Sequence, residues 1–151
     1  MKKLAAALFS LVLVVSLAGC SIPKDDVLDS LGKYESKQFF TSGGFQDFTD
    51  YAKYCFDSVD FSDNSYFQIV TESSRENLEA HIDDFETWIQ LKRESDSKNE
   101  VGIYYDFDRS VITDGDYLYI YDNPEYPELG CYDVYYFDVE SNILYYFHNN
   151  I

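Results

Sequence analysis

The sequence has few basic residues and no apolar run long enough to span a membrane. Lys and Arg number 11 in a chain of 151 residues, against 28 Asp and Glu, so the formal net charge is −17. This deficit argues against nucleic-acid binding, because phosphates are held through Lys and Arg. It also argues against electrostatic attachment to anionic lipid. The apolar fraction of 46% is that of a globular chain, and the length suits one domain.

The sequence also lacks the short motifs of common catalytic and metal sites. It holds no HExxH helix, no zinc-type cysteine and histidine spacing, no GxSxG elbow and no EF-hand loop. We therefore predict no enzyme activity, no cofactor and no metal centre, apart from a weak surface calcium site left open near Asp114, Asp116 or Asp122. His81 and His148 are expected to be partly buried, hydrogen-bonded rings.

The N-terminus has the pattern of a secretory signal peptide. Lys2 and Lys3 precede an apolar run of 14 residues, Leu4 to Leu17, which is shorter than the roughly 20 residues of a membrane-spanning helix. Small residues and a cysteine follow it. A charged start, a short apolar middle and small residues at a cleavage point are typical of a signal that is removed.

The residues Leu17-Ala18-Gly19-Cys20 resemble the lipobox of bacterial lipoproteins. The resemblance covers only the first 20 residues, and it names no family for the mature domain. It implies that residues 1–19 are cleaved and that Cys20 receives a diacylglyceryl group. Two acyl chains give stable anchoring where one holds marginally. We therefore expect a protein anchored by lipid to the outer face of the bacterial cell membrane.

Cleavage makes the mature chain more acidic. Nine Lys and Arg would then face 28 Asp and Glu, a formal charge of −19. An anionic membrane repels such a domain over a Debye length of roughly 8–10 Å. We predict a lipidated tether over residues 20–43, with a short helix capped by Asp25 and carrying Val27, Leu31 and Tyr34, and a single domain over residues 44–151.

Two longer helices are predicted from apolar spacing. Phe45, Phe48, Ala52 and Cys55 recur at helical intervals and predict a helix over residues 45–57. Ser73 and Glu76 fit a capping box at the start of a second helix over about residues 74–92. Its apolar stripe is Leu78, Ile82, Phe85 and Ile89.

From residue 100 onward the apolar period changes from 3.6 to 2. Four strands are predicted, over about residues 101–107, 117–121, 134–139 and 143–148. Asp114-Gly115 marks one tight turn, and Asn142 suits the left-handed position of a hairpin loop. The short connections favour an antiparallel meander. We therefore predict an α+β fold, in which N-terminal helices pack on one face of a C-terminal four-stranded sheet.

Two cysteines remain after lipidation of Cys20. A disulfide between Cys55 and Cys131 would add a few kcal/mol of stability. Two buried thiols acting as small apolar residues fit the spacing equally well. The sequence leaves both alternatives open.

The tyrosines are the least ordinary feature, because 11 of the 15 lie between residues 104 and 146. Tyr117, Tyr119 and Tyr121 share one strand face, opposite Leu118 and Ile120, and form a candidate binding stripe. Aromatic rings with a polar tip are enriched at interfaces. Cross-strand pairing that only stabilises the sheet is the alternative explanation.

We expect a non-enzymatic binding module whose Tyr-rich acidic face contacts a basic protein, a glycan or a second copy, and no nucleic acid. One alternative is a small hydrolase of cell-wall or polysaccharide material. It would use Asp106 and Asp108, which on a strand would be about 7 Å apart. Another is an inhibitor or immunity-type lipoprotein.

Overall fold

The structure is a computed structural model that describes residues 25–42, 48–96, 98–125 and 130–150. The chain divides into two units, Met1–Ser30 and Leu31–Ile151. The described part of the first unit holds one helical turn, α2 (Asp26–Asp29), and the Asp25 carboxylate accepts a hydrogen bond from the Leu28 amide at 2.9 Å. The cap at Asp25 is confirmed. The predicted signal peptide and Cys20 lie outside the described residues.

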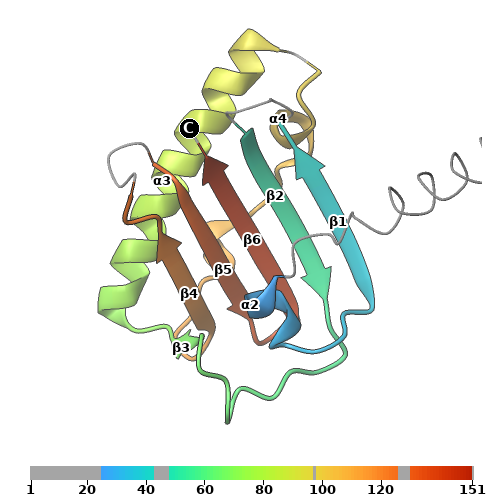
Figure 1. Cartoon of the computed structure of the whole chain (residues 1–151), viewed down its shortest axis with the longest axis vertical. Coiled ribbons are helices and arrows are strands. Elements are labelled where there is room, and N and C mark those ends of the chain that lie inside the picture. Colours follow the sequence, from blue (N-terminus) through green and yellow to red (C-terminus); the bar gives the residue numbers. More distant parts are fainter. Residues whose placement is uncertain (1–24, 43–47, 97, 126–129, 151) are drawn as a thin grey trace, which may run out of the picture. The chain divides into compact units, whose positions relative to one another are not determined.

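The second unit is built on a six-stranded antiparallel sheet with the order β1-β2-β6-β5-β4-β3 (Figure 1). The α+β class is therefore confirmed, but the expected four-stranded sheet is wrong. Three strands precede the long helix, so helices and strands are not segregated as predicted. The strands are β1 (Ser36–Thr41), β2 (Phe48–Cys55), β3 (Gln68–Ile69), β4 (Tyr117–Asp122), β5 (Tyr132–Asp138) and β6 (Ile143–Asn150).

The meander β4-β5-β6 follows the sequence prediction closely. Each strand pairs with the next in antiparallel register. Asn142 takes the left-handed conformation, with φ of 54°, in the β5–β6 loop. Gly115 has φ of 99° in the turn before β4, where a side chain would be strained. These strands were predictable because turn residues bound each of them.

The first hairpin was not predicted. Ser36–Thr41, which we assigned to the tether, forms β1 and pairs with β2 from Ser36 opposite Cys55 to Thr41 opposite Asp50. The sheet therefore begins before the predicted domain boundary at residue 44. The predicted helix over residues 45–57 is also wrong, because Phe48–Cys55 is β2. Tyr51 and Ala52 are adjacent and both 0% exposed, so apolar residues on two covered faces imitated a helical stripe.

The predicted strand over residues 101–107 is wrong as well. The segment forms the short helix α4 (Glu100–Tyr104), followed by a connection and the 3-10 turn η1 (Arg109–Val111). The Asn99 side chain caps α4 by accepting a hydrogen bond from the Gly102 amide at 3.0 Å. This local cap outweighs the alternation of Val101 and Ile103, of which only Val101 is buried.

The long helix α3 (Glu72–Ser95) confirms the second predicted helix, and its predicted stripe of four residues is buried. Its N-cap is Thr71, which forms the capping box with Ser74, rather than Ser73 with Glu76. Phe85 packs edge to face on Phe147 of β6, with ring centroids 5.3 Å apart. The helix therefore covers the sheet face that carries Leu118, Val134, Tyr136 and Phe147.

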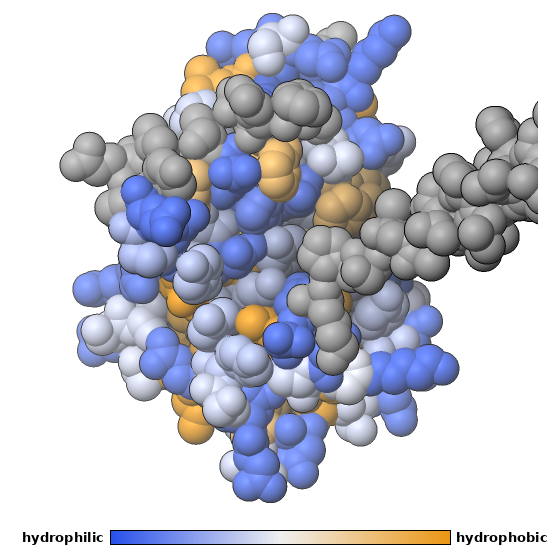
Figure 2. Space-filling view, in the orientation of Figure 1, coloured by the Kyte–Doolittle hydropathy of each residue, from blue (hydrophilic) through white to orange (hydrophobic). Residues whose placement is uncertain are grey.

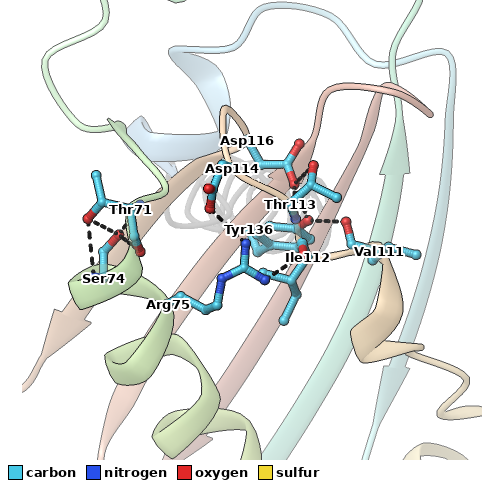
Figure 3. Close-up of polar contacts among 9 residues, drawn as sticks. All are labelled: Thr71, Ser74, Arg75, Val111, Ile112, Thr113, Asp114, Asp116 and Tyr136. Carbon is cyan, nitrogen blue, oxygen red and sulfur yellow. Dashed lines mark hydrogen bonds and ion pairs between the residues drawn. The ribbon is translucent and has the colours of Figure 1, made fainter.

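A polar network ties the start of α3 to the turn before β4 (Figure 3). The Arg75 guanidinium donates to the Ile112 carbonyl at 2.7 Å and to the Asp114 carboxylate at 2.9 Å. The carboxylate of Asp116, only 2% exposed, accepts hydrogen bonds from the Thr113 amide and the Tyr136 hydroxyl at 2.7 and 2.6 Å. This network fixes the edge of the helix-covered face.

Candidate functional site

The three tyrosines of the predicted stripe lie on the sheet face opposite α3, which we call the open face. Their strand partners alternate with the residues buried under α3: Leu118 and Ile120 belong to the core, whereas Tyr117, Tyr119 and Tyr121 point away from it. Reading along the register, the open face also carries Asp50, Asp133, Tyr135, Phe137, Leu144, Tyr146 and His148. Figure 2 views this face, whose described surface is mainly blue and pale with separate orange areas.

Aromatic residues from the connection between β2 and β3 cover one end of the open face. Phe61 stacks on Tyr117 with ring centroids 3.8 Å apart and planes within 7°. It also meets Phe137 edge to face at 5.0 Å. Tyr117 therefore belongs to a packed aromatic cluster. The three tyrosines share a face, but they do not share an environment, because Tyr121 is 45% exposed.

Tyr119 lies between the covered end and the rest of the face. Tyr66 meets its ring edge to face at 5.6 Å, and Tyr135 lies at 6.0 Å on the neighbouring strand. Tyr135 in turn lies 4.8 Å from Tyr146. A row of three tyrosine rings therefore crosses β4, β5 and β6, as the cross-strand pairing alternative expected.

Beyond this row, the open face carries a polar cluster of Asp133, Tyr146 and His148. The Tyr146 hydroxyl donates to the Asp133 carboxylate at 2.7 Å, and His148 Nδ1 lies 2.7 Å from the same oxygen. The side chains of His148 and Asp133 are 19% and 26% exposed, so both are accessible. The prediction of a partly buried, hydrogen-bonded His148 is confirmed.

Asp50 lies beside His148 in the register of β2 and β6. Its residue is 9% exposed, and its Oδ1 atom has no hydrogen-bond partner among the described residues. Burial raises the pKa of the Asp50 carboxyl above its usual value, against the lowering effects of a hydrogen bond with Thr41 and the charge of His148. Sequence reasoning missed this carboxylate because it placed residue 50 on a helix.

A hollow of about 180 Å³ opens beside the polar cluster. It is small by comparison with ligand pockets of roughly 300–1,000 Å³, so it suits one side chain rather than a large ligand. Its lining includes Tyr121, Asn123, Asp133, His148 and Asn150. The open face therefore combines exposed aromatic rings with a carboxylate at a small recess.

The carboxylates of the alternative hydrolase are not arranged as the sequence suggested. Asp106 and Asp108 lie in the connection after α4 and not on a strand. Asp106 pairs with Lys53 and accepts the Tyr51 hydroxyl at 3.0 Å. Asp108 caps η1 by accepting from the Ser110 amide at 2.9 Å. Because neither residue lies on a strand, the spacing that suggested a catalytic pair is absent. Both side chains instead stabilise local structure.

The other polar candidates are engaged in a similar way. Asp114 pairs with Arg75, and Asp116 is buried in the network of Figure 3. The Asp122 carboxylate lies 2.9 Å from His81 Nε2. Within the described ranges, no group of three or more His, Cys, Asp or Glu side chains is placed to hold a metal ion. Cys55 and Cys131 form no disulfide, so the disulfide alternative is not realised.

Four tyrosines on the helix-covered side, three of them buried and Tyr105 half-buried, each donate a hydrogen bond to a carboxylate. Burial, with the neighbouring carboxylate, raises the pKa of Tyr51, Tyr105, Tyr132 and Tyr136 well above the usual tyrosine value. Their respective acceptors are Asp106, Glu86, Asp84 and Asp116, at 2.6–3.0 Å. The composition shows that tyrosines and carboxylates are abundant. It does not show which of them pair, because the pairs connect segments that only the fold brings together.

No helix in the described ranges is long and apolar enough to cross a bilayer. Comparison of the chain with models of protein families, with curated proteins and with solved structures finds no match.

Proposed function

We propose that the chain is a lipid-anchored, extracytoplasmic binding module that takes a basic polypeptide segment on its open face. The observation that carries the proposal is the polar cluster of Asp133, Tyr146 and His148 beside the exposed ring of Tyr121. A cationic side chain placed there gains a carboxylate partner and an aromatic face together. In this proposal, Asp133 and Tyr121 recognise the partner through charge and aromatic contact.

Charge favours a basic partner over a glycan or a second copy at this face. The only Lys or Arg among the described strand residues of the open face is Lys37, whereas Asp50 and Asp133 are both acidic. A chain with a formal charge of −17 also attracts basic partners over long range, in a salt-dependent way. Two copies meeting through this face would bring like charges together.

The anchor is supported by the resemblance of Leu17-Ala18-Gly19-Cys20 to a lipobox. Lipid, rather than surface charge, would hold so acidic a protein at a membrane. Mass spectrometry of the mature N-terminus tests this part of the proposal. Cys20→Ala is expected to leave an unlipidated, uncleaved precursor, and normal lipid labelling of that variant would contradict the anchor.

Titration calorimetry of the full chain with a hexa-arginine peptide, at low and physiological salt, tests the binding surface. Tyr121→Ser and Asp133→Asn are each expected to weaken binding about tenfold, which corresponds to about 1.4 kcal/mol. Tyr121→Ser is the cleaner variant, because Tyr121 is 45% exposed and its replacement is expected to leave the sheet intact.

Glu79→Gln is the matched control, since it removes one exposed carboxylate from α3 and leaves the open face unchanged. It is expected to weaken binding less than twofold. Equal losses in Glu79→Gln and Asp133→Asn would show that the peptide is held by diffuse charge, and the open-face proposal would then fail.

A further inference from the structure

The two edges of the sheet differ in length. β3 ends one side with two residues, whereas β1 ends the other with six (Figure 1). Within the described part of the chain, no strand pairs with the outer side of β1. An edge strand of this length is a template for another strand unless charge, proline or a bulge protects it. β1 contains no proline and a single charged residue, Lys37.

The alternation of hydrogen-bonded pairs between β1 and β2 shows which amide groups of β1 point away from β2. The Ser42 amide donates to the Thr49 carbonyl at 2.8 Å, and the Phe56 amide on the other side of β2 donates to the Asn142 carbonyl at 3.0 Å. Hydrogen-bonded pairs recur at every second residue of an antiparallel ladder. Gln38 and Phe40 therefore turn their amides toward β2, and Lys37 and Phe39 turn theirs to the outer edge.

The exposed side chains of β1 favour association. Phe39 is 42% exposed, and the Lys37 ammonium lies 4.6 Å from the centre of its ring. The strand carries no carboxylate, although the whole chain has 28. Most surfaces of such an acidic protein repel a second copy. The β1 edge offers backbone donors, backbone acceptors and an aromatic ring without that repulsion.

We propose that β1 is a self-association edge, at which two copies pair antiparallel about a two-fold axis through Phe39. This register aligns the outward N–H and C=O of Phe39 with those of Phe39 in the second copy. The two phenyl rings then lie side by side on the open faces of one continuous sheet. The pairing uses the edge of β1 and leaves Tyr121 and Asp133, at the other side of the sheet, free to bind a partner.

Sedimentation of the purified full chain across a range of protein concentrations tests the proposal. The wild type is expected to form dimers, and Phe39→Lys to weaken the dimer at least tenfold, because two ammonium groups would meet at the axis. Ile69→Lys is the control, since it also replaces an apolar residue by lysine, at a position 55% exposed on the opposite edge strand. It is expected to leave the dimer intact. A wild type that stays monomeric, or equal losses in both variants, would overturn the proposal.

Cysteine cross-linking tests the register. Directly opposite residues of a hydrogen-bonded antiparallel pair have Cα atoms about 5.5 Å apart, which suits a disulfide. Phe39→Cys is therefore expected to give a cross-linked dimer under mild oxidation. Lys37→Cys is expected to give none above background, because the axis separates the two copies of residue 37. Both variants retain the thiols of Cys55 and Cys131, so background from these thiols is shared. Efficient cross-linking at residue 37 would rule out this pairing.

Discussion

Tyrosine and aspartate are common in this chain for a shared structural reason. Each buried tyrosine hydroxyl needs an acceptor, and a carboxylate supplies a strong one. Tyr51 bonds Asp106, and Tyr136 bonds Asp116. Asp50 differs from these carboxylates, because it is buried with one oxygen unpartnered. Residues that cost stability in this way often mark sites kept for function.

Replacing Asp50 by Asn is expected to stabilise the protein at neutral pH. Burial raises the pKa of Asp50, so the folded state holds its proton more tightly than the unfolded state does. The stability linked to that proton is complete below pH about 4 and is lost as pH rises through the folded pKa. Asp50→Asn should therefore gain about 1 kcal/mol at pH 7 in urea unfolding.

The gain should shrink as the pH falls toward 4, because Asp50 itself then becomes neutral. Asp63→Asn, at an exposed loop carboxylate, is the control and should change the unfolding free energy by less than about 0.5 kcal/mol. A loss of stability in Asp50→Asn at pH 7 would contradict the unfavourable burial.

Among the elements, the long helix and the strands bounded by turn residues were the easiest to predict. The stripe of α3 and the alternation of β4 and β6 each follow one clear period. β2 was misassigned because both of its faces are buried, and residues 100–104 were misassigned because a local cap decides their conformation. The start of α3 shows the limit of motif matching, since Thr71 and not Ser73 caps it.

The cap of α3 can be tested with two neighbouring substitutions. Thr71→Ala is expected to lower the free energy of unfolding by about 1 kcal/mol, because its hydroxyl accepts from the Ser74 amide. Ser73→Ala is the matched control, since Ser73 lies inside the helix and is exposed. It should change stability by less than about 0.5 kcal/mol. Urea unfolding of both variants measures the difference, and a larger loss in Ser73→Ala would support the cap that the sequence suggested.

At the scale of the whole molecule, the four tyrosines bonded to carboxylates make the fold sensitive to alkali. Burial raises the pKa of Tyr51, Tyr105, Tyr132 and Tyr136 above the value of about 10 that unfolded tyrosine has. The stabilisation linked to their protons is complete below pH 10 and is lost as the pH rises toward the folded pKa values. Unfolding should therefore accompany ionisation, rather than follow it.

Each such tyrosine should reduce stability by about 1.4 kcal/mol per pH unit above pH 10, so four should reduce it by about 5–6 kcal/mol per unit. Tyrosinate absorbance and far-ultraviolet circular dichroism should change together near pH 11–12. Tyr105→Phe should reduce the slope by about a quarter, and its acceptor Glu86 keeps a partner in Arg109. Titration of these four tyrosines without loss of structure would contradict this linkage.

The sequence by itself determined the α+β class, helix α3, the meander β4-β5-β6 and the face that Tyr117, Tyr119 and Tyr121 share. These features depend on local periodicity and on turn residues such as Asn142. Only the tertiary structure decided that Tyr117 lies under Phe61, that β1 and β2 extend the sheet, and that Asp50, Asp133 and His148 meet on one face. The physical reason is strand register: it places Asp50 beside His148, 98 positions further along the chain, and no local pattern encodes which strands become neighbours.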